Sequence, residues 1–143
     1  MKLQILGTRG YIEPTAPYHA RHSGLLIDDI LLFDCGEPEF LAYKPQAVFI
    51  THLHPDHAYF VASGQMFPQI TVPLYAPEIL EATPIKVLSQ KISIGNYTII
   101  PVPTEHSIKV KSQAYIIKKG DQKILYTGDM LWIQKKSSLF KRS

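Results

Sequence analysis

One segment of this 143-residue chain, Thr51-His52-Leu53-His54-Pro55-Asp56-His57, concentrates side chains that bind metal ions. Alternate side chains of an extended segment point the same way, so His52 and His54 are expected on one side. The proline that follows is favoured at the first position of a helix, whose first turn would bring Asp56 and His57 toward the same point. Imidazole and carboxylate are ligands of zinc, with manganese or iron as alternatives. The spacing therefore predicts a metal site.

Other polar residues carry weaker signals. The alternative for the segment above is a polar loop whose histidines only form hydrogen bonds, but its density of ligand types favours a metal. His19 and His22 have metal-like spacing within a proline-containing loop, where a plain loop role or a substrate contact is favoured. Asp34 follows an apolar run and is expected either to orient a ligand histidine or to form a turn. Cys35 is the one cysteine, which excludes an intrachain disulfide and favours a structural role.

The elements that must position these side chains are short. Apolar runs broken by Gly and Pro dominate the chain, which is typical of strands rather than long helices. The expected strands cover residues 3–6, 25–27, 31–33, 47–50, 72–76, 91–94, 97–102, 114–117 and 123–126. Prolines predict two short helices, over 55–63 and 77–81. The pattern indicates a β-rich chain with two layered sheets.

Composition limits the function classes. With 45% hydrophobic residues and no repeat or linker, residues 1–143 are expected to form a single domain. The chain has 15 Lys+Arg against 12 Asp+Glu, and four of the basic residues follow Asp129. We expect this basic C-terminal tail to be a solvent-exposed end. That charge gives only weak support for nucleic-acid binding. The lack of a membrane-length apolar segment, of a signal-peptide pattern and of disulfides predicts a cytoplasmic protein without a membrane partner.

The segment around residue 52 also resembles a known signature. His52-x-His54-x-Asp56-His57 is similar to the HxHxDH motif of the metallo-β-lactamase superfamily. Thr104-Glu105-His106 and Tyr126-Thr127-Gly128-Asp129 resemble, in order, the later ligand motifs of that family. The run Leu32-Phe33-Asp34-Cys35-Gly36 looks like its strand that closes near the site. The opening Leu6-Gly7-Thr8-Arg9-Gly10 resembles the branch that contains the tRNA 3′-processing nuclease and small phosphodiesterases.

This resemblance implies an α+β, four-layer αββα fold and one or two zinc ions. By the family's pattern, one zinc would be bound by His52, His54 and His106. Asp56 and His57 would bind a second zinc, with Asp129 bridging the two. The implied nucleophile is a metal-bound hydroxide, because zinc lowers the pKa of bound water from 15.7 to about 7. Asp56 is also the expected catalytic proton acceptor.

The chain departs from that pattern at its end. The family places a further ligand histidine and a second half of strands and helices after the motif at Asp129, and no histidine follows that residue here. We therefore expect the N-terminal half and middle strands of the fold, with the C-terminal part missing. The leading function is hydrolysis of a phosphodiester in a small-molecule or nucleotide-like substrate. The alternatives are a non-catalytic metal-binding fragment and a thioester or lactone hydrolase with the same ligands. Uncovered apolar strands further predict self-association.

Overall fold

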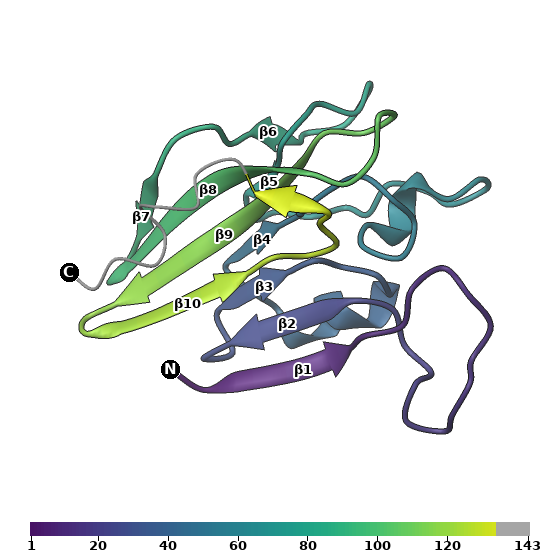
Figure 1. The fold of residues 1–143 in the computed structure, drawn as a ribbon, viewed down its shortest axis with the longest axis horizontal. Coiled ribbons are helices and arrows are strands. Elements are labelled where there is room, and N and C mark those ends of the chain that lie inside the picture. The colour runs from purple at the N-terminus through teal and green to yellow at the C-terminus, as the bar shows by residue number, and fades with distance from the viewer. Residues whose placement is uncertain (134–143) are drawn as a thin grey trace.

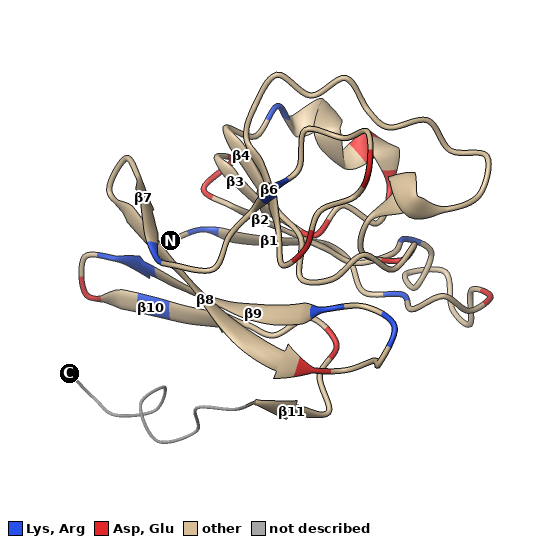
Figure 2. Ribbon diagram, turned by 90° about the horizontal axis from the view of Figure 1, so that it is seen from above, with Lys and Arg blue, Asp and Glu red and all other residues tan. Residues whose placement is uncertain are grey.

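The computed structural model describes residues 1–133, which form two β-sheets and two short 3₁₀ helices. Figure 1 shows the strands along the chain, and Figure 2 shows the two sheets as separate layers, with helical turns beside one of them. The expectation of a β-rich chain with two layered sheets is confirmed for these residues. Two strands of two residues each, β6 and β11, were not predicted because such short runs carry no periodicity.

The first sheet positions the histidine-rich segment. It contains, in spatial order, β1 (Leu3–Gly7), β2 (Gly24–Ile27), β3 (Leu31–Phe33), β4 (Ala47–Phe49), β5 (Leu74–Ala76) and β6 (Lys86–Val87). Strands β1 to β3 are antiparallel, and β3 to β6 are parallel. Asp28, Asp29 and Ile30 join β2 to β3, and Ile30 N–H donates to Ile27 O at 2.9 Å. Asp28 and Asp29 have φ of 50° and 59°, a left-handed conformation that aspartate tolerates in turns. The parallel step from β3 to β4 passes through the 3₁₀ helix η1 (Pro38–Tyr43).

The second sheet is antiparallel throughout. It contains, in spatial order, β10 (Gln122–Tyr126), β9 (Ser112–Lys119), β8 (Tyr97–Glu105) and β11 (Trp132–Ile133), and β7 (Ile92–Ile94) also pairs with β8. Both predicted hairpins, β7–β8 and β9–β10, are confirmed. Gly95 and Gly120 each have a positive φ in the connecting turns, which explains why glycine stands there.

The main core lies between the two sheets. The rings of Phe33 and Phe49 stack at 4.9 Å between centroids, and the ring of Tyr115 from β9 meets each of them edge-on at 5.6 Å. All three side chains are fully buried. Such offset and edge-on aromatic pairs stabilise a core beyond the area they bury. The two sheets therefore share one packed hydrophobic core.

A polar cluster also joins the sheets at the β2–β3 turn. The hydroxyl of Tyr97 donates to Asp28 at 2.5 Å, and the ammonium of Lys119 donates to the same carboxylate at 2.9 Å. The Asp28 carboxylate also accepts a hydrogen bond from the backbone N–H of Lys2. These bonds lower the pKa of Asp28 well below its usual range, with the Tyr97 hydroxyl as the largest cause. The cluster lies at the start of β3, away from the histidines that follow β4.

Both helix predictions are wrong. Residues 55–57 form a single turn, followed by the 3₁₀ helix η2 (Tyr59–Val61), and residues 77–81 form bends and a turn. The first segment is tied to the chain after β3, since Cys35 N–H donates to His57 O and Tyr59 N–H donates to Cys35 O. Those backbone groups are then not available for helical hydrogen bonds. Residues 1–133 form two sheets, with η1 and η2 on the outer face of the first, where Phe40 and Phe60 pack. The four-layer αββα arrangement remains a prediction.

No helix among residues 1–133 is long and apolar enough to cross a membrane. The basic tail residues Lys135, Lys136, Lys141 and Arg142, expected to be a solvated end, lie outside the described residues.

Candidate metal centre

The histidine-rich segment and Asp34 meet because neighbouring parallel strands end at the same edge of a sheet. Asp34 follows β3 with φ of 60°, and the segment beginning at Thr51 follows β4. The Asp34 N–H donates to Phe49 O at 2.7 Å, so the two strands stay paired up to this edge. His57 N–H and Ala58 N–H both donate to His54 O, which closes one tight turn. This turn directs Asp56 and His57 back toward His52.

The second sheet brings His106 and Asp129 to the same place. His106 follows β8 and Asp129 follows β10, and these two strands run in the same direction on either side of β9. The sheets are joined here, because Gln113 N–H donates to Thr51 O at 2.9 Å and His52 forms an isolated bridge with Ser112.

Gly128 allows the closest approach between the two sheets. Its φ is 57°, and a Cβ atom at this position would lie 2.5 Å from the hydroxyl oxygen of Thr51. A larger residue would therefore displace the turn that carries Asp129. The sequence-based expectation that glycine permits a tight turn here is confirmed.

Three histidines form the first candidate ligand group. The ligand nitrogens of His52, His54 and His106 all lie within 4.8 Å of one another. Their ring centroids are 4.7 Å apart for His52 with His54, 4.7 Å for His52 with His106, and 5.2 Å for His54 with His106. Three nitrogens converging in this way are the protein ligands of a tetrahedral zinc site that keeps one position open.

A second candidate group adjoins the first. Ligand atoms of His52, His57 and Asp129 also lie within 4.8 Å of one another. His57 Nε2 is 3.4 Å from Asp56 Oδ2 and 3.4 Å from Asp129 Oδ2, while His106 Nε2 is 3.9 Å from Asp129 Oδ2. Asp129 thus lies between the two groups, where the resemblance places a bridging carboxylate.

The donor set fits a divalent cation. His52 Nε2 is a buried nitrogen without a hydrogen-bond partner, and the partners of the buried His57 Nε2 are the two carboxylates at 3.4 Å. Buried polar atoms are normally paired, so the unpaired nitrogen of His52, beside a histidine with two carboxylates, fits a cation at this cluster. Nitrogen and carboxylate donors together match zinc, and they also suit manganese or iron.

Asp34 is the most heavily bonded carboxylate of the site. It is fully buried, and its Oδ2 lies 2.6 Å from His57 Nδ1. It also accepts hydrogen bonds from Thr51 N–H at 2.7 Å, from the Thr51 hydroxyl and from the Tyr126 hydroxyl at 3.1 Å. The contact with His57 agrees with the first interpretation of Asp34, a partner that orients a histidine of the cluster. Its backbone is left-handed but does not form a turn, so the structure does not support the second interpretation.

Burial and charge divide the histidines into two kinds. Burial lowers the pKa of His52 to about 4, and burial also lowers the pKa of His54. Burial acts in the same direction on His57, but Asp34, Asp129 and Asp56 outweigh it and raise the pKa of His57 to about 12. Hydrogen bonding to His57 lowers the pKa of Asp129 to about 2. The imidazoles of His52 and His54 are thus neutral at pH 7, while carboxylates surround His57.

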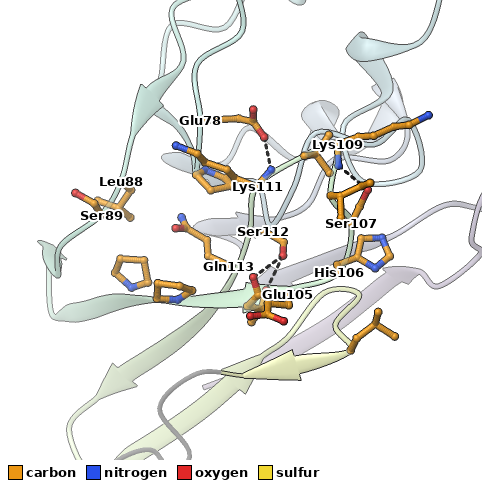
Figure 3. A pocket seen from close by; sticks show the side chains of 17 residues that line it. Glu78, Leu88, Ser89, Glu105, His106, Ser107, Lys109, Lys111, Ser112 and Gln113 are labelled. Atoms are coloured by element: carbon orange, nitrogen blue, oxygen red, sulfur yellow. Dashed lines mark hydrogen bonds between the residues drawn. The ribbon is translucent and has the colours of Figure 1, made fainter.

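Two cavities border the cluster. Figure 3 shows a cavity of about 740 Å³ that His106 borders on one side, with Leu88 and Ser89 on the other. A second cavity, of about 390 Å³, reaches from His57 and Asp129 to the strands β1 and β2. A substrate at the cluster would have space on both sides.

Solved structures share this architecture. YhfI from Bacillus subtilis, a metallo-β-lactamase fold protein, superposes with a TM-score of 0.62 and 24% identity over 89% of this chain and 62% of its own. This chain has the metallo-β-lactamase fold. Human tRNase Z, short form, superposes with a TM-score of 0.63 and 18% identity over 94% of this chain and 71% of its own. A diphosphatase of the PhnP family gives a TM-score of 0.55, with 22% identity over 80% of this chain and 61% of its own.

A sequence relative adds to the fold assignment. Ribonuclease Z from Methanocaldococcus jannaschii is 31% identical over 153 aligned positions, which take in 83% of this chain and 48% of the relative. The chain therefore spans about half the length of this curated relative. No protein-family description matches the chain.

Within this metallo-β-lactamase fold, the structure brings together every residue that the sequence singled out as a ligand. These are His52, His54, Asp56, His57, His106 and Asp129. His19 and His22 are not part of the cluster. The ring of His19 contacts the Thr15 hydroxyl, and the ring of His22 contacts the Glu37 carboxylate. Burial raises the pKa of the Cys35 thiol, in line with a structural role. Sequence reasoning missed Thr51 and Tyr126, the two hydroxyls on Asp34.

Proposed function

We propose that this chain is a metal-dependent hydrolase that acts on phosphodiester bonds, with zinc as its metal. The observation that carries the proposal is the convergence of His52, His54 and His106 on one point, beside His57 and Asp129. The buried Nε2 of His52, which has no hydrogen-bond partner, supports the proposal, because a metal ligand needs a free lone pair. The ribonuclease Z relative and the fold shared with human tRNase Z favour a phosphodiester in a nucleotide or RNA substrate.

The roles of the side chains follow from their positions. His52, His54 and His106 would hold one metal, and Asp56 with His57 would hold a second, with Asp129 shared. A bound divalent metal supplies positive charge for the developing oxyanion and lowers the pKa of a coordinated water. Asp56 Oδ2, 3.4 Å from His57 Nε2, lies where it could accept a proton from the attacking water. Burial raises the pKa of Asp56, but the hydrogen bond and charge of His57 and a backbone hydrogen bond together outweigh it, so the pKa is lowered and this carboxylate is an acceptor at neutral pH.

The cavity beside His106 offers space and charged side chains for a substrate that extends beyond the cluster. The cavity beside His106 includes Lys109 and Lys111, whose charges suit flanking phosphates, together with Glu78 and Glu105. Thioester and lactone hydrolysis would use the same cluster, so the substrate must be decided by assay. The second candidate is a metal-binding chain without turnover, which would use the same two ligand groups.

The test is hydrolysis of bis(p-nitrophenyl) phosphate, a precursor tRNA, a thioester and a lactone by the zinc-loaded protein. We expect release of p-nitrophenol and cleavage of the precursor tRNA, and loss of both with Asp56→Ala or with chelator. Asp121→Ala, at an exposed turn position, is the matched control and should behave as wild type. Zinc binding without turnover of any substrate would favour the second candidate. Activity that survives both Asp56→Ala and chelator would contradict the proposal.

A further inference from the structure

The hydroxyl of Thr51 lies between the two candidate metal groups. We propose that Thr51 is a positioning residue: it links His52 to Asp34, so that one buried carboxylate orients a histidine of each group. This inference rests on the metal centre proposed above, and it concerns how that centre is held in shape. Neither the motif nor the resemblance assigned Thr51 a role.

The contacts of the Thr51 hydroxyl show to which atom it donates and from which atom it accepts. Thr51 Oγ1 lies 3.1 Å and 2.9 Å from the two oxygens of Asp34, and 3.0 Å from His52 Nδ1. A hydroxyl has one proton to donate and lone pairs to accept with. A carboxylate only accepts hydrogen bonds, so the hydroxyl proton goes to Asp34, which also accepts from Thr51 N–H and the Tyr126 hydroxyl. Its oxygen then accepts from His52 Nδ1–H.

This chain of bonds selects the tautomer of His52. A neutral imidazole carries one N–H, and placing it on Nδ1 leaves the Nε2 lone pair free. That Nε2 is the buried nitrogen without a partner, and it belongs to both candidate groups. Metal-bound histidines generally donate their other ring N–H to a carboxylate or another acceptor, which fixes the ring. In His52 the Thr51 hydroxyl is that acceptor.

The same carboxylate acts directly on the other group. Asp34 Oδ2 lies 2.6 Å from His57 Nδ1, which turns His57 Nε2 toward Asp56 and Asp129. The rings of His52 and His57 are packed at 4.1 Å between centroids. A change in the orientation of one ring would therefore move the other, and Asp34 couples them through one direct and one hydroxyl-mediated contact.

Packing leaves the Thr51 hydroxyl one further contact, His57 Nδ1 at 3.5 Å, and that nitrogen already lies 2.6 Å from Asp34 Oδ2. The residue is 1% exposed, its N–H is bonded to Asp34 and its carbonyl accepts from Gln113. A Cβ on Gly128 would lie 2.8 Å from the Thr51 methyl carbon, so the turn that carries Asp129 rests on this side chain. A purely structural interpretation, in which Thr51 only fills space, makes a different prediction. It requires the shape of the side chain and not its hydroxyl.

Two substitutions separate these interpretations. Thr51→Val keeps the branched shape and removes the hydroxyl, while Thr51→Ser keeps the hydroxyl and removes the methyl group. Zinc affinity is measured by competition with a chromophoric chelator, after circular dichroism has shown that each variant is folded. We expect Thr51→Val to weaken zinc binding about 10- to 100-fold, and Thr51→Ser to stay within about threefold of wild type. Equal affinity of Thr51→Val and wild type would overturn the proposal, as would a greater loss in Thr51→Ser than in Thr51→Val.

A measurement on the unmodified chain makes the proposal independent of how the variants fold. Nitrogen-15 spectra of the histidine rings, recorded without metal at neutral pH, report which nitrogen of His52 carries the proton. The expected result is the Nδ1–H tautomer, and an Nε2–H tautomer would overturn the link to Thr51. Zinc titration of the same sample tests the proposed function separately. Absence of zinc binding with the Nδ1–H tautomer present would contradict the metal centre and leave the hydroxyl link standing.

Discussion

Replacing Asp34 by asparagine is expected to destabilise the protein far more than the small chemical change would indicate. The carboxylate accepts from four donors, namely Thr51 N–H, the Thr51 hydroxyl, His57 Nδ1 and the Tyr126 hydroxyl. Asparagine has one acceptor oxygen, so in either orientation its amino group faces at least one of these donors. Asparagine tolerates the left-handed backbone found at Asp34, where φ is 60°, so backbone strain contributes little to the cost of the substitution.

The size of the loss follows from the burial of these groups. A hydrogen bond to a charged group contributes about 1.5–3 kcal/mol, and the exchange removes at least one of them together with the charge. Removing one partner of a buried ion pair costs about 3–5 kcal/mol, and this is the decrease in unfolding free energy that we expect. Urea unfolding followed by circular dichroism, in the presence of chelator, measures it. Zinc should stabilise the variant less than wild type, because Asp34 also orients His57.

Asp29→Asn is the matched control for Asp34→Asn. Asp29 also has a left-handed backbone, with φ of 59°, but its carboxylate is exposed and bonded only to Lys2 among the contacts seen. An exposed ion pair of this kind contributes about 0–1 kcal/mol. Equal losses for the two variants would refute the reasoning, because the effect would then come from the backbone position and not from the buried carboxylate.

Further outcomes follow from other parts of the structure. His54→Ala should abolish the tighter zinc site in metal analysis while His19→Ala keeps it, and unchanged stoichiometry in His54→Ala would contradict the ligand assignment. Asp28 has a lowered folded-state pKa, so its contribution should be present above about pH 4 and be lost below it. Asp28→Asn should therefore cost about 1–2 kcal/mol at pH 7 and flatten the acid limb of the stability curve; an unchanged acid limb would contradict this. Leu3 and Ile5 are 49% and 71% exposed and line the cavity beside β10, so light scattering should detect self-association that Ile5→Lys weakens. A monodisperse monomer of 16.2 kDa at micromolar concentration would count against it.

Most of the strands could be predicted because they are short apolar runs between turn residues. Asp28 and Asp29, for example, separate the apolar runs of β2 and β3, and the structure places them in the turn between these strands. The helices over 55–63 and 77–81 were wrong because each rested on a proline alone, without an apolar period to support it. In the first, hydrogen bonds between Cys35, His57 and Tyr59 hold the backbone against the end of β3. Such pairing between distant segments carries no local signal.

The candidate site likewise has a part that the sequence predicted and a part that it could not predict. Ligand type and spacing were enough to single out His52, His54, Asp56 and His57, which lie in one stretch of chain. The role of Asp34 was left open between two interpretations, and its contacts with Tyr126, 92 residues later, could not be foreseen. Those contacts depend on the packing of β10 over β3, which the sequence does not encode locally. Metal ligation by the cluster remains a prediction.

The central claim is that two sheets bring His52, His54 and His106 together to hold a metal. Crystals of the zinc-loaded chain, measured on both sides of the zinc absorption edge, test it most directly. The account predicts an anomalous peak about 2.0–2.2 Å from His52 Nε2 and from one ring nitrogen each of His54 and His106. A zinc peak elsewhere, such as beside His19 and His22, with none at the cluster would contradict it.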